Sequence, residues 1–259
     1  MPTTKHHPAR YPQNSPSRSR AYTYVPPEDG YRNELSRGDY RVRELVTQVG
    51  EPQNLVSYHL RLLRDGGLVT STRSSYDGRD SYYHLNLDHC ADILIGAGAA
   101  LHPALRLRCA PTAFEPTGPL AVLFVCTGNS ARSAIAQALL RRHCGGHVEV
   151  LSAGSRPKPA MHPKTVRVLR REYGRDISDQ SPRHLAPLGE RRFDAVITLC
   201  DKAREICPDF GNSTAAIHWS IADPAATGNT DEDSYPLFQA TATEIDTRTR
   251  HLLPVPATR

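Results

Sequence analysis

The stretch LAVLFVCTGNSARSAIAQALL, residues 120–140, decides the fold of the larger part of this 259-residue chain. It begins with an unbroken apolar run over 120–125, which is typical of a strand buried in a parallel sheet. From Ala134 onwards the apolar residues recur at helical spacing. Cys126 therefore lies between the end of a strand and the start of a helix. Backbone N–H groups and the helix dipole converge in such a loop, so the sequence predicts an anion-binding site there.

The same loop predicts a nucleophilic cysteine. The field of a helix N-terminus favours the thiolate form of a cysteine, which is the reactive form. Arg132 has a planar fork of donors for two oxyanion oxygens, and Ser133 can hydrogen-bond the Cys126 thiolate. A structural cysteine beside an ion-pairing arginine is the alternative. The expected oxyanion-binding residues are Thr127, Gly128, Asn129, Ser130, Ala131, Arg132 and Ser133.

Four motifs, in this order, resemble the low-molecular-weight protein tyrosine phosphatase fold. They are VLFVCTGNSARSAIAQALL (122–140), LSAGSRPKP (151–159), FDAVITLCD (193–201) and HWSIADPA (218–225). The resemblance spans residues 119–253 and implies an α/β domain with a four-stranded parallel sheet. It also implies that Asp223, in the Asp-Pro pair, is the general acid. The strands are expected near 121–125, 148–153, 194–199 and 215–219.

Phosphatases and arsenate reductases share this fold, and two further cysteines favour the reductases. Cys200 follows an apolar run, and Cys207 comes seven residues later. Resemblance to the thioredoxin-coupled arsenate reductases implies that Cys126 attacks arsenate and that Cys200 then attacks Cys126. Cys207 would move the disulfide to Cys200–Cys207, where thioredoxin or a low-molecular-weight thiol reduces it. Packing thiols are the alternative for this pair. No bound cofactor and no metal site are expected.

Residues 34–88 carry a different pattern. A helical run over 42–49 ends at Gly50, a second helix ends at Gly66, and two strand-like runs follow around the turn at 76–78. RELVTQVGEPQNLVSYHLRLLRDGGLV and DGRDSYYHLN resemble the winged helix-turn-helix of the ArsR/SmtB repressors. The resemblance implies DNA-binding residues Gln53, Asn54, Ser57, Tyr58 and His59 on the second helix, and Arg73 and Arg79 on the wing. The polar faces of a small helical domain are the alternative.

The ArsR/SmtB resemblance also implies operator DNA as a partner and a homodimer formed through the N-terminal domain. The cysteine-rich metal motif of that family is absent from VRELVTQV (42–49). Cys90 and Cys109 could still bind arsenite, because thiolates are soft ligands, or could be incidental thiols. Two other functions stay open: a phosphotyrosine phosphatase, and a transcriptional regulator that senses an oxyanion.

Composition limits the remaining possibilities. Six cysteines are too few for a disulfide scaffold in a chain of this length, and the net charge of +5 is a weak indicator of nucleic-acid binding. The apolar runs are too short for a membrane span, and no signal peptide is evident, so a cytoplasmic location is expected. The C-terminal helix, with Pro236 near its start, is expected to be short. The expected units are a disordered tail at 1–33, a winged helix-turn-helix at 34–100, a linker at 101–118 and the α/β domain at 119–253.

Overall fold

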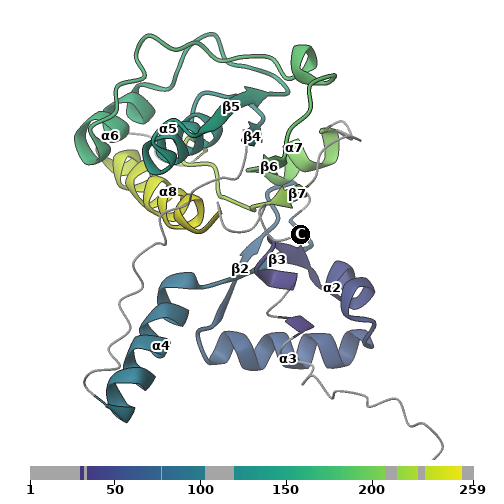
Figure 1. Ribbon diagram of the computed structural model, residues 1–259. Coiled ribbons are helices and arrows are strands. Elements are labelled where there is room, and N and C mark those ends of the chain that lie inside the picture. The colour runs from purple at the N-terminus through teal and green to yellow at the C-terminus, as the bar shows by residue number, and fades with distance from the viewer. Residues whose placement is uncertain are drawn as a thin grey trace, which may run out of the picture.

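The computed structural model describes residues 30–31, 34–76, 78–102, 120–207, 215–226 and 231–252 (Figure 1). Two separate hydrophobic cores organise the chain. The first contains side chains between Tyr31 and Val69, and the second contains side chains between Val122 and Leu252. None of the helices in these described ranges combines the length and the apolar composition that crossing a bilayer requires.

The N-terminal domain has the element order of a winged helix-turn-helix. Its elements are β1 (Tyr40–Arg41), α2 (Val42–Val49), α3 (Gln53–Asp65), β2 (Val69–Arg73), β3 (Ser81–Leu85) and α4 (Leu87–Leu101). The three strands form an antiparallel sheet in the order β1-β3-β2, and the β2–β3 hairpin is the wing. Gly50, at a φ of 74°, ends α2 and makes the tight turn into α3. The expected winged helix-turn-helix is therefore confirmed.

The C-terminal domain is an α/β fold. Its elements are β4 (Leu120–Cys126), α5 (Arg132–Cys144), β5 (Val148–Gly154), α6 (Pro163–Tyr173), a short 3-10 helix (Ala186–Leu188), β6 (Ala195–Thr198), α7 (Asp201–Ile206), β7 (Ala215–His218) and α8 (Asp231–Leu252). All four strands are parallel, in the order β5-β4-β6-β7. The four-stranded parallel sheet predicted from the sequence is confirmed, with each strand within two residues of its expected bounds.

The central strand positions the loop that follows it. The last five residues of β4 are buried, as the apolar run predicts for a strand with neighbours on both sides. Its register pairs Cys126 with Gly154 at the end of β5. Cys126 therefore emerges at the carboxyl edge of the sheet, where open α/β sheets place their ligands.

Two sequence expectations need correction. Tyr31, assigned to a disordered tail, is helical and fully buried in the first core, because its ring packs against His59 at a centroid distance of 5.4 Å. The C-terminal helix is not short: α8 runs for 22 residues through Pro236, and buried Phe238, Ala242 and Ile245 hold it to the domain. Most of the expected linker, residues 103–118, lies outside the described residues, as do residues 1–29 of the expected tail.

The two domains touch through the wing (Figure 1). The Ser75 backbone N–H at the wing tip donates to Asp201 Oδ2 of α7 at 2.6 Å. Before β1, Asp39 accepts a hydrogen bond from the Ser220 backbone N–H at 2.8 Å and pairs with Arg248 of α8 at 2.8 Å. Asp39 is 2% exposed, so this part of the interface is shielded from bulk solvent.

Candidate active site

The nucleophile candidate lies in a tight polar pocket. The side chain of Cys126 is buried at the end of β4, and its Sγ lies 3.0 Å from Ser133 Oγ in the first turn of α5. The backbone N–H of Asn129 donates to the same sulfur at 3.2 Å. The Ser133 hydroxyl and the Asn129 N–H therefore both lie within hydrogen-bond distance of the Cys126 sulfur.

Asn129 holds the loop in shape. It adopts a left-handed conformation with a φ of 48°, which an asparagine tolerates better than most residues. Its side-chain amide donates to Ser133 Oγ at 2.9 Å and to Ser152 Oγ at 2.8 Å, and its Oδ1 accepts the Arg183 backbone N–H at 2.7 Å. The sequence predicted that Asn129 binds the oxyanion, whereas in the structure its side chain makes hydrogen bonds that stabilise the loop. Ser152, which sequence reasoning missed, faces the loop because the buried strand β5 runs beside β4.

The backbone of the loop turns its amides in one direction. The carbonyl oxygens of four loop residues accept hydrogen bonds from the segment after β5. The pairs are Ser155 to Cys126, Arg156 to Thr127, Lys158 to Gly128 and His162 to Ser130, at 2.8–3.2 Å. In a trans peptide the N–H points opposite to the C=O. The amides that follow these carbonyls therefore face the other way, as the Asn129 N–H does toward Cys126, and a row of donors with this geometry, here called the cradle, is able to hold an anion.

Arg132 and Asp223 meet at the mouth of this cradle. Arg132 is 6% exposed, and its guanidinium donates to Asp223 Oδ2 at 2.9 Å and to the Ile221 carbonyl oxygen at 2.9 Å. Its Nε is buried and has no hydrogen-bond partner among the described residues. A buried donor of this kind calls for an acceptor, and an oxyanion in the cradle would supply one. The side chain of Asp223 remains 41% exposed, so solvent reaches its carboxylate.

The structure brings the second cysteine to the loop and leaves the third at a distance. Cys200 is buried, and its Sγ lies 3.4 Å from Thr127 Oγ1, beside Cys126. Cys200 and Cys207 are the two caps of α7, so the helix separates them. Cys207 is half-buried, and that burial raises the pKa of its thiol to about 11.

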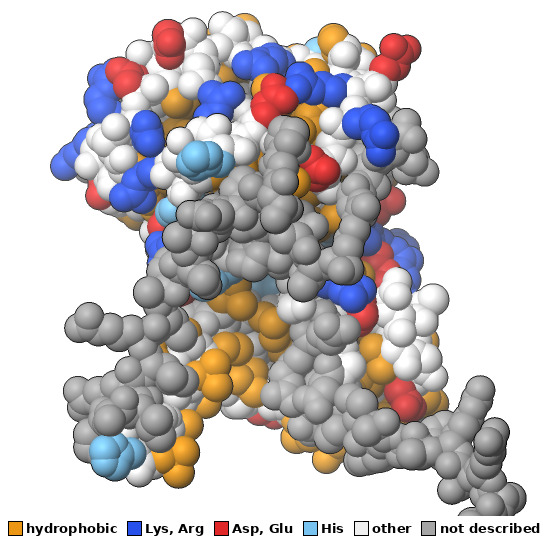
Figure 2. Space-filling view, in the orientation of Figure 1, with side chains coloured by type: hydrophobic (Ala, Val, Ile, Leu, Met, Phe, Trp, Pro, Cys, Tyr) orange, Lys and Arg blue, Asp and Glu red, His pale blue; other side chains and the backbone are white. Residues whose placement is uncertain are grey.

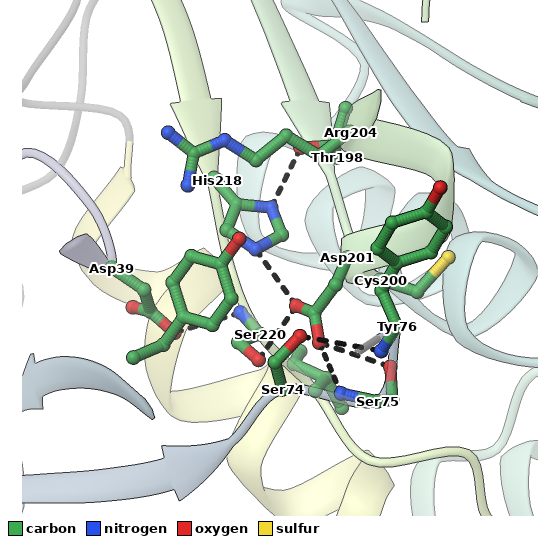
Figure 3. Close-up of polar contacts among 12 residues, drawn as sticks. Asp39, Ser74, Ser75, Tyr76, Thr198, Cys200, Asp201, Arg204, His218 and Ser220 are labelled. Atoms are coloured by element: carbon green, nitrogen blue, oxygen red, sulfur yellow. Dashed lines mark hydrogen bonds and ion pairs between the residues drawn. The ribbon is translucent and has the colours of Figure 1, made fainter. Parts of the chain in front are cut away.

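Below Cys200 lies a buried polar network that sequence reasoning missed (Figure 3). Asp201 is 1% exposed and accepts hydrogen bonds from His218 Nε2 at 3.1 Å, Ser220 Oγ at 2.8 Å and Ser75 of the wing. Thr198 Oγ1 lies 2.8 Å from His218 Nδ1. Burial alone would raise the pKa of Asp201, but these hydrogen bonds outweigh it and hold the pKa below its usual range. The feature of the sequence that could have pointed to this network is Asp201 itself, an acidic residue in the first turn of the helix after Cys200.

The proposed DNA-reading face is largely exposed. Gln53, Asn54, Ser57 and Tyr58 are exposed on α3. His59 is half-buried, because its ring packs between Tyr31 and Tyr58. Sequence reasoning missed two basic residues beside them. Arg61 and Arg64 line an open hollow on the surface of α3, together with Asn54, Ser57, Tyr58 and Tyr83. The spacing of the two arginines along one face of the helix could have predicted this from the sequence.

The remaining sequence candidates lie apart from this site. Arg73 and Arg79 are exposed on the wing, on either side of its tip. Cys90 is half-buried on α4, with its Sγ 3.8 Å from the Leu68 carbonyl oxygen, and Cys109 lies outside the described residues. Within the part of the chain that the structure describes, no group of three or more His, Cys, Asp or Glu side chains is arranged to hold a metal ion.

Comparison with known proteins agrees with this geometry. A family model described as low molecular weight phosphotyrosine protein phosphatase matches residues 121–258, and one described as bacterial regulatory protein, arsR family, matches residues 33–71. Arsenate reductases of Bacillus licheniformis and Halalkalibacterium halodurans are 36% and 33% identical over 127 residues, which are 49% of this chain and 90% of each relative. A solved thioredoxin-dependent arsenate reductase of Corynebacterium glutamicum is 25% identical with a TM-score of 0.43, covering 86% of this chain and 95% of that one. Because the phosphatase model matches more than half of its residues, this chain belongs to the low molecular weight phosphotyrosine protein phosphatase family, and its C-terminal domain is homologous to the arsenate reductases.

Proposed function

We propose that this protein reduces arsenate to arsenite with electrons from an external thiol system such as thioredoxin. The observation that carries the proposal is the position of Cys200, whose Sγ lies 3.4 Å from Thr127 Oγ1 in the loop after Cys126. Ester hydrolysis needs a nucleophile, an oxyanion-binding group and an acid. A second buried thiol beside the nucleophile adds the means to form a disulfide, which a reduction requires. The homologous arsenate reductases support the same function.

The first step joins arsenic to sulfur. Arsenate binds in the cradle of loop amides, and the buried Nε of Arg132 donates to one of its oxygens. The Cys126 thiolate attacks arsenic, and Asp223 protonates the departing oxygen, which leaves as water. Ser133 and the Asn129 N–H hold the sulfur at the start of this step.

The next steps move the oxidation outward along the chain. The Cys200 thiolate attacks Cys126 Sγ, the sulfur–arsenic electron pair passes to arsenic, and arsenite leaves. The Cys207 thiolate then attacks Cys200 Sγ and releases Cys126 as a thiolate, so the disulfide now joins Cys200 and Cys207. A helix separates residues seven apart by about 10 Å, whereas a disulfide needs Cα atoms within about 7 Å. Helix α7 must therefore open in this step.

The test is arsenate-dependent NADPH oxidation in the presence of thioredoxin and thioredoxin reductase. Cys126→Ser, Cys200→Ser and Cys207→Ser should each lower turnover at least about 10³-fold, because each removes one step of the thiol relay. Cys90→Ser, which lies on α4 away from the loop, is the matched control and should keep its activity. Para-nitrophenyl phosphate is the parallel substrate. Cleavage of this ester by the Cys200→Ser variant, without arsenate turnover by the intact chain, would instead identify a phosphatase.

The N-terminal domain is proposed to bind DNA. The match to the arsR-family model and the exposed face of α3 support this role, with Gln53, Asn54, Ser57 and Tyr58 at the base edges. His59 is left out of that face because it packs against Tyr31. Arg73 and Arg79 remain the proposed phosphate contacts of the wing. Electrophoretic mobility shift with DNA from the promoter upstream of the coding sequence tests this, and Asn54→Ala with Ser57→Ala should abolish the specific shift.

A homodimer is proposed to form through α4. Ile93, Leu94 and Leu101 are 44%, 57% and 80% exposed on this helix, and Figure 2 shows apolar side chains gathered on the lower part of the molecule, where Figure 1 places α4. Exposed apolar surface of this kind marks an interaction site. Leu94→Glu should convert the dimer into a monomer in sedimentation velocity, and a dimer that survives this change would exclude α4. The cytoplasm is the proposed location, since the relay needs reduced thiols.

A further inference from the structure

The redox helix α7 is held from outside its own domain. Three of its six residues make polar contacts with the N-terminal domain. Asp201 accepts the Ser75 N–H at 2.6 Å and the Ser75 hydroxyl at 3.0 Å, and Arg204 donates to Glu44 of α2 at 2.8 Å. Glu205 pairs with the buried guanidinium of Arg41, at the end of β1. Figure 3 shows the wing residues Ser74 and Ser75 lying directly against the Asp201 carboxylate, one residue after Cys200.

These contacts fit only the helical form of α7. Asp201, Arg204 and Glu205 reach their partners from consecutive turns of one helix, so their spacing depends on the helix staying intact. A Cys200–Cys207 disulfide requires the two ends of α7 to approach by several ångströms. The ion pairs and the Ser75 contact cannot all survive that change. The N-terminal domain therefore stabilises the reduced, helical state relative to the oxidised one.

We propose that Ser75, Glu44 and Arg41 of the winged-helix domain are positioning residues of the redox centre, which hold α7 in its reduced form and set the reduction potential of the Cys200–Cys207 pair. The inference rests on the proposed function, since it assumes that this pair carries the relay disulfide. Linkage makes the effect reciprocal: docking favours the dithiol, and oxidation weakens the docking by the same factor. In the described part of the chain, the hydrogen bonds of these three residues to the C-terminal domain go to Asp201, Arg204 and Glu205 of α7, so they act through this helix.

The test measures an equilibrium in the full-length chain. In a Cys126→Ser background, the protein is equilibrated with glutathione at a series of poises. One oxidised glutathione takes two electrons and two protons from Cys200 and Cys207, leaving their disulfide and two reduced glutathiones. The fraction of Cys200–Cys207 disulfide is read by acid quench, alkylation and peptide mass spectrometry. The variants are Glu44→Gln alone and Glu44→Gln with Ser75→Ala. The matched control is Glu51→Gln with Ser71→Ala, on the same domain and outside the contacts with α7.

The double variant should shift the equilibrium toward the disulfide about tenfold, which is about 30 mV for a two-electron couple. Glu44→Gln alone should shift it less in the same direction, and this single variant decides the matter if the double variant fails to fold. The control should stay within twofold of the parent. A disulfide that forms with the same equilibrium constant in all variants overturns the inference and leaves the relay standing. A Cys200–Cys207 disulfide that forms at no poise overturns both.

A second measurement reads the reciprocal effect. Hydrogen exchange of the wing tip, residues 74–76, is compared before and after oxidation of the Cys126→Ser chain with diamide. The Ser75 N–H donates to Asp201 in the reduced state, so its exchange should become at least tenfold faster when α7 opens. Helix α3, in the same domain and away from α7, should keep its exchange rate. Equal protection of the wing in both redox states would contradict the proposal.

Discussion

Gly154 has no side chain, and this leaves room for the loop that follows Cys126 to pack against the end of β5. A Cβ atom here would lie 2.7 Å from the Thr127 carbonyl oxygen and 2.9 Å from the Asn129 amide nitrogen. Both are backbone atoms, which cannot rotate aside, so Gly154→Ala must displace the loop. Overpacking of this kind costs about 1–3 kcal/mol. We therefore expect phosphate, the stable mimic of arsenate, to bind about tenfold more weakly to this variant in isothermal titration calorimetry.

The control for this substitution is Gly96→Ala. Gly96 lies in α4, and an added Cβ atom would meet nothing within 4 Å. Its phosphate affinity should equal that of the parent chain. Unchanged affinity in Gly154→Ala as well would mean that the loop tolerates the displacement and that the close approach to β5 is not needed for anion binding.

Cys207 should titrate as a buried thiol. Burial raises its pKa to about 11, so the closed structure holds the proton and Cys207 is a poor nucleophile at neutral pH. Because the folded pKa is the higher one, the protonated thiol favours the closed form of α7 below about pH 9, and this contribution is lost as the pH rises toward 11. The rate of Cys207 alkylation by iodoacetamide should rise about tenfold per pH unit between about pH 8 and 10.

Peptide mass spectrometry after short pulses of alkylation gives this rate. The unfolded chain in urea is the reference, and there the rate should level off near the ordinary thiol pKa of about 8.5. If the folded chain levels off at the same pH, the fold does not shield Cys207, and opening of α7 would be needed only to bring Cys207 to Cys200 and not to ionise its thiol.

Some partners of these residues follow from the sequence and others do not. Cys126 and Ser133 are seven residues apart across a strand, a loop and a helix start, so their approach at 3.0 Å could be anticipated from the motif. Asn129 reaches Ser152 and Arg183, which lie 23 and 54 residues away. No periodicity connects these positions. Their contacts depend on how β5 and the segment after it pass the loop, which only the tertiary structure shows.

At the scale of elements, packing decided where propensity misled. The strands could be predicted because a short, continuous apolar run of about four to seven residues is typical of a strand that is buried on both faces of a parallel sheet. The C-terminal helix could not, because Pro236 and several threonines argue against a long helix. In the structure Pro236 lies in the second turn of α8, where it removes only one helical hydrogen bond. Burial of Phe238 and Ile245 against the second core outweighs that loss.

Helix α3 carries a prediction about DNA. Arg61 and Arg64 are exposed on the hollow that Asn54 and Ser57 line, where they would face phosphates. Each phosphate contact contributes about 0.9 to the slope of log K against log salt. Arg61→Ala with Arg64→Ala should therefore reduce the slope by about 2, measured by fluorescence anisotropy with a labelled duplex over a series of KCl concentrations.

The matched control is Arg170→Ala with Arg171→Ala, on an exposed face of α6 in the other domain. It removes the same net charge from the chain, so it separates a local contact from a general effect of charge. A slope that falls equally in both double variants would show that DNA binding depends on total charge and not on the face of α3.

At the scale of the whole molecule, the contact between the domains was beyond prediction from the sequence. Ser75 and Asp201 are 126 residues apart, and Asp39 and Ser220 are 181 apart. Each domain matches its own family pattern, and neither pattern includes the other domain. The contact places the wing, the proposed phosphate-binding element, on the helix that carries the proposed relay disulfide. Opening of α7 would then release the wing from its contact and increase its conformational freedom. This contact therefore links the proposed arsenate reduction to the proposed DNA binding.

Asp39 should make the two domains unfold as one unit. It is 2% exposed, accepts the Ser220 N–H at 2.8 Å and pairs with Arg248 at 2.8 Å. Asp39→Ala leaves the largely buried Arg248 guanidinium with Glu244, at 2.8 Å, as its remaining ion-pair partner, so the loss should be at most the about 3–5 kcal/mol of a fully broken buried pair. In urea the parent chain should show a single transition. The variant should show two, with the signal of Trp219, in the C-terminal domain, separated from the far-ultraviolet circular dichroism of the whole chain.

The control is Glu149→Ala, which breaks a surface ion pair with Arg191 whose side chains are 50% and 42% exposed. Exposed pairs contribute about 0–1 kcal/mol, so this variant should keep one transition at nearly the parent midpoint. Two transitions in the parent chain would show that the domains are independent despite their contacts. A single transition in Asp39→Ala, at the parent midpoint, would show that the contacts between the wing and α7 hold the domains together without this ion pair. Those contacts would then contribute more free energy to the coupling of the domains than the buried pair of Asp39 and Arg248 does.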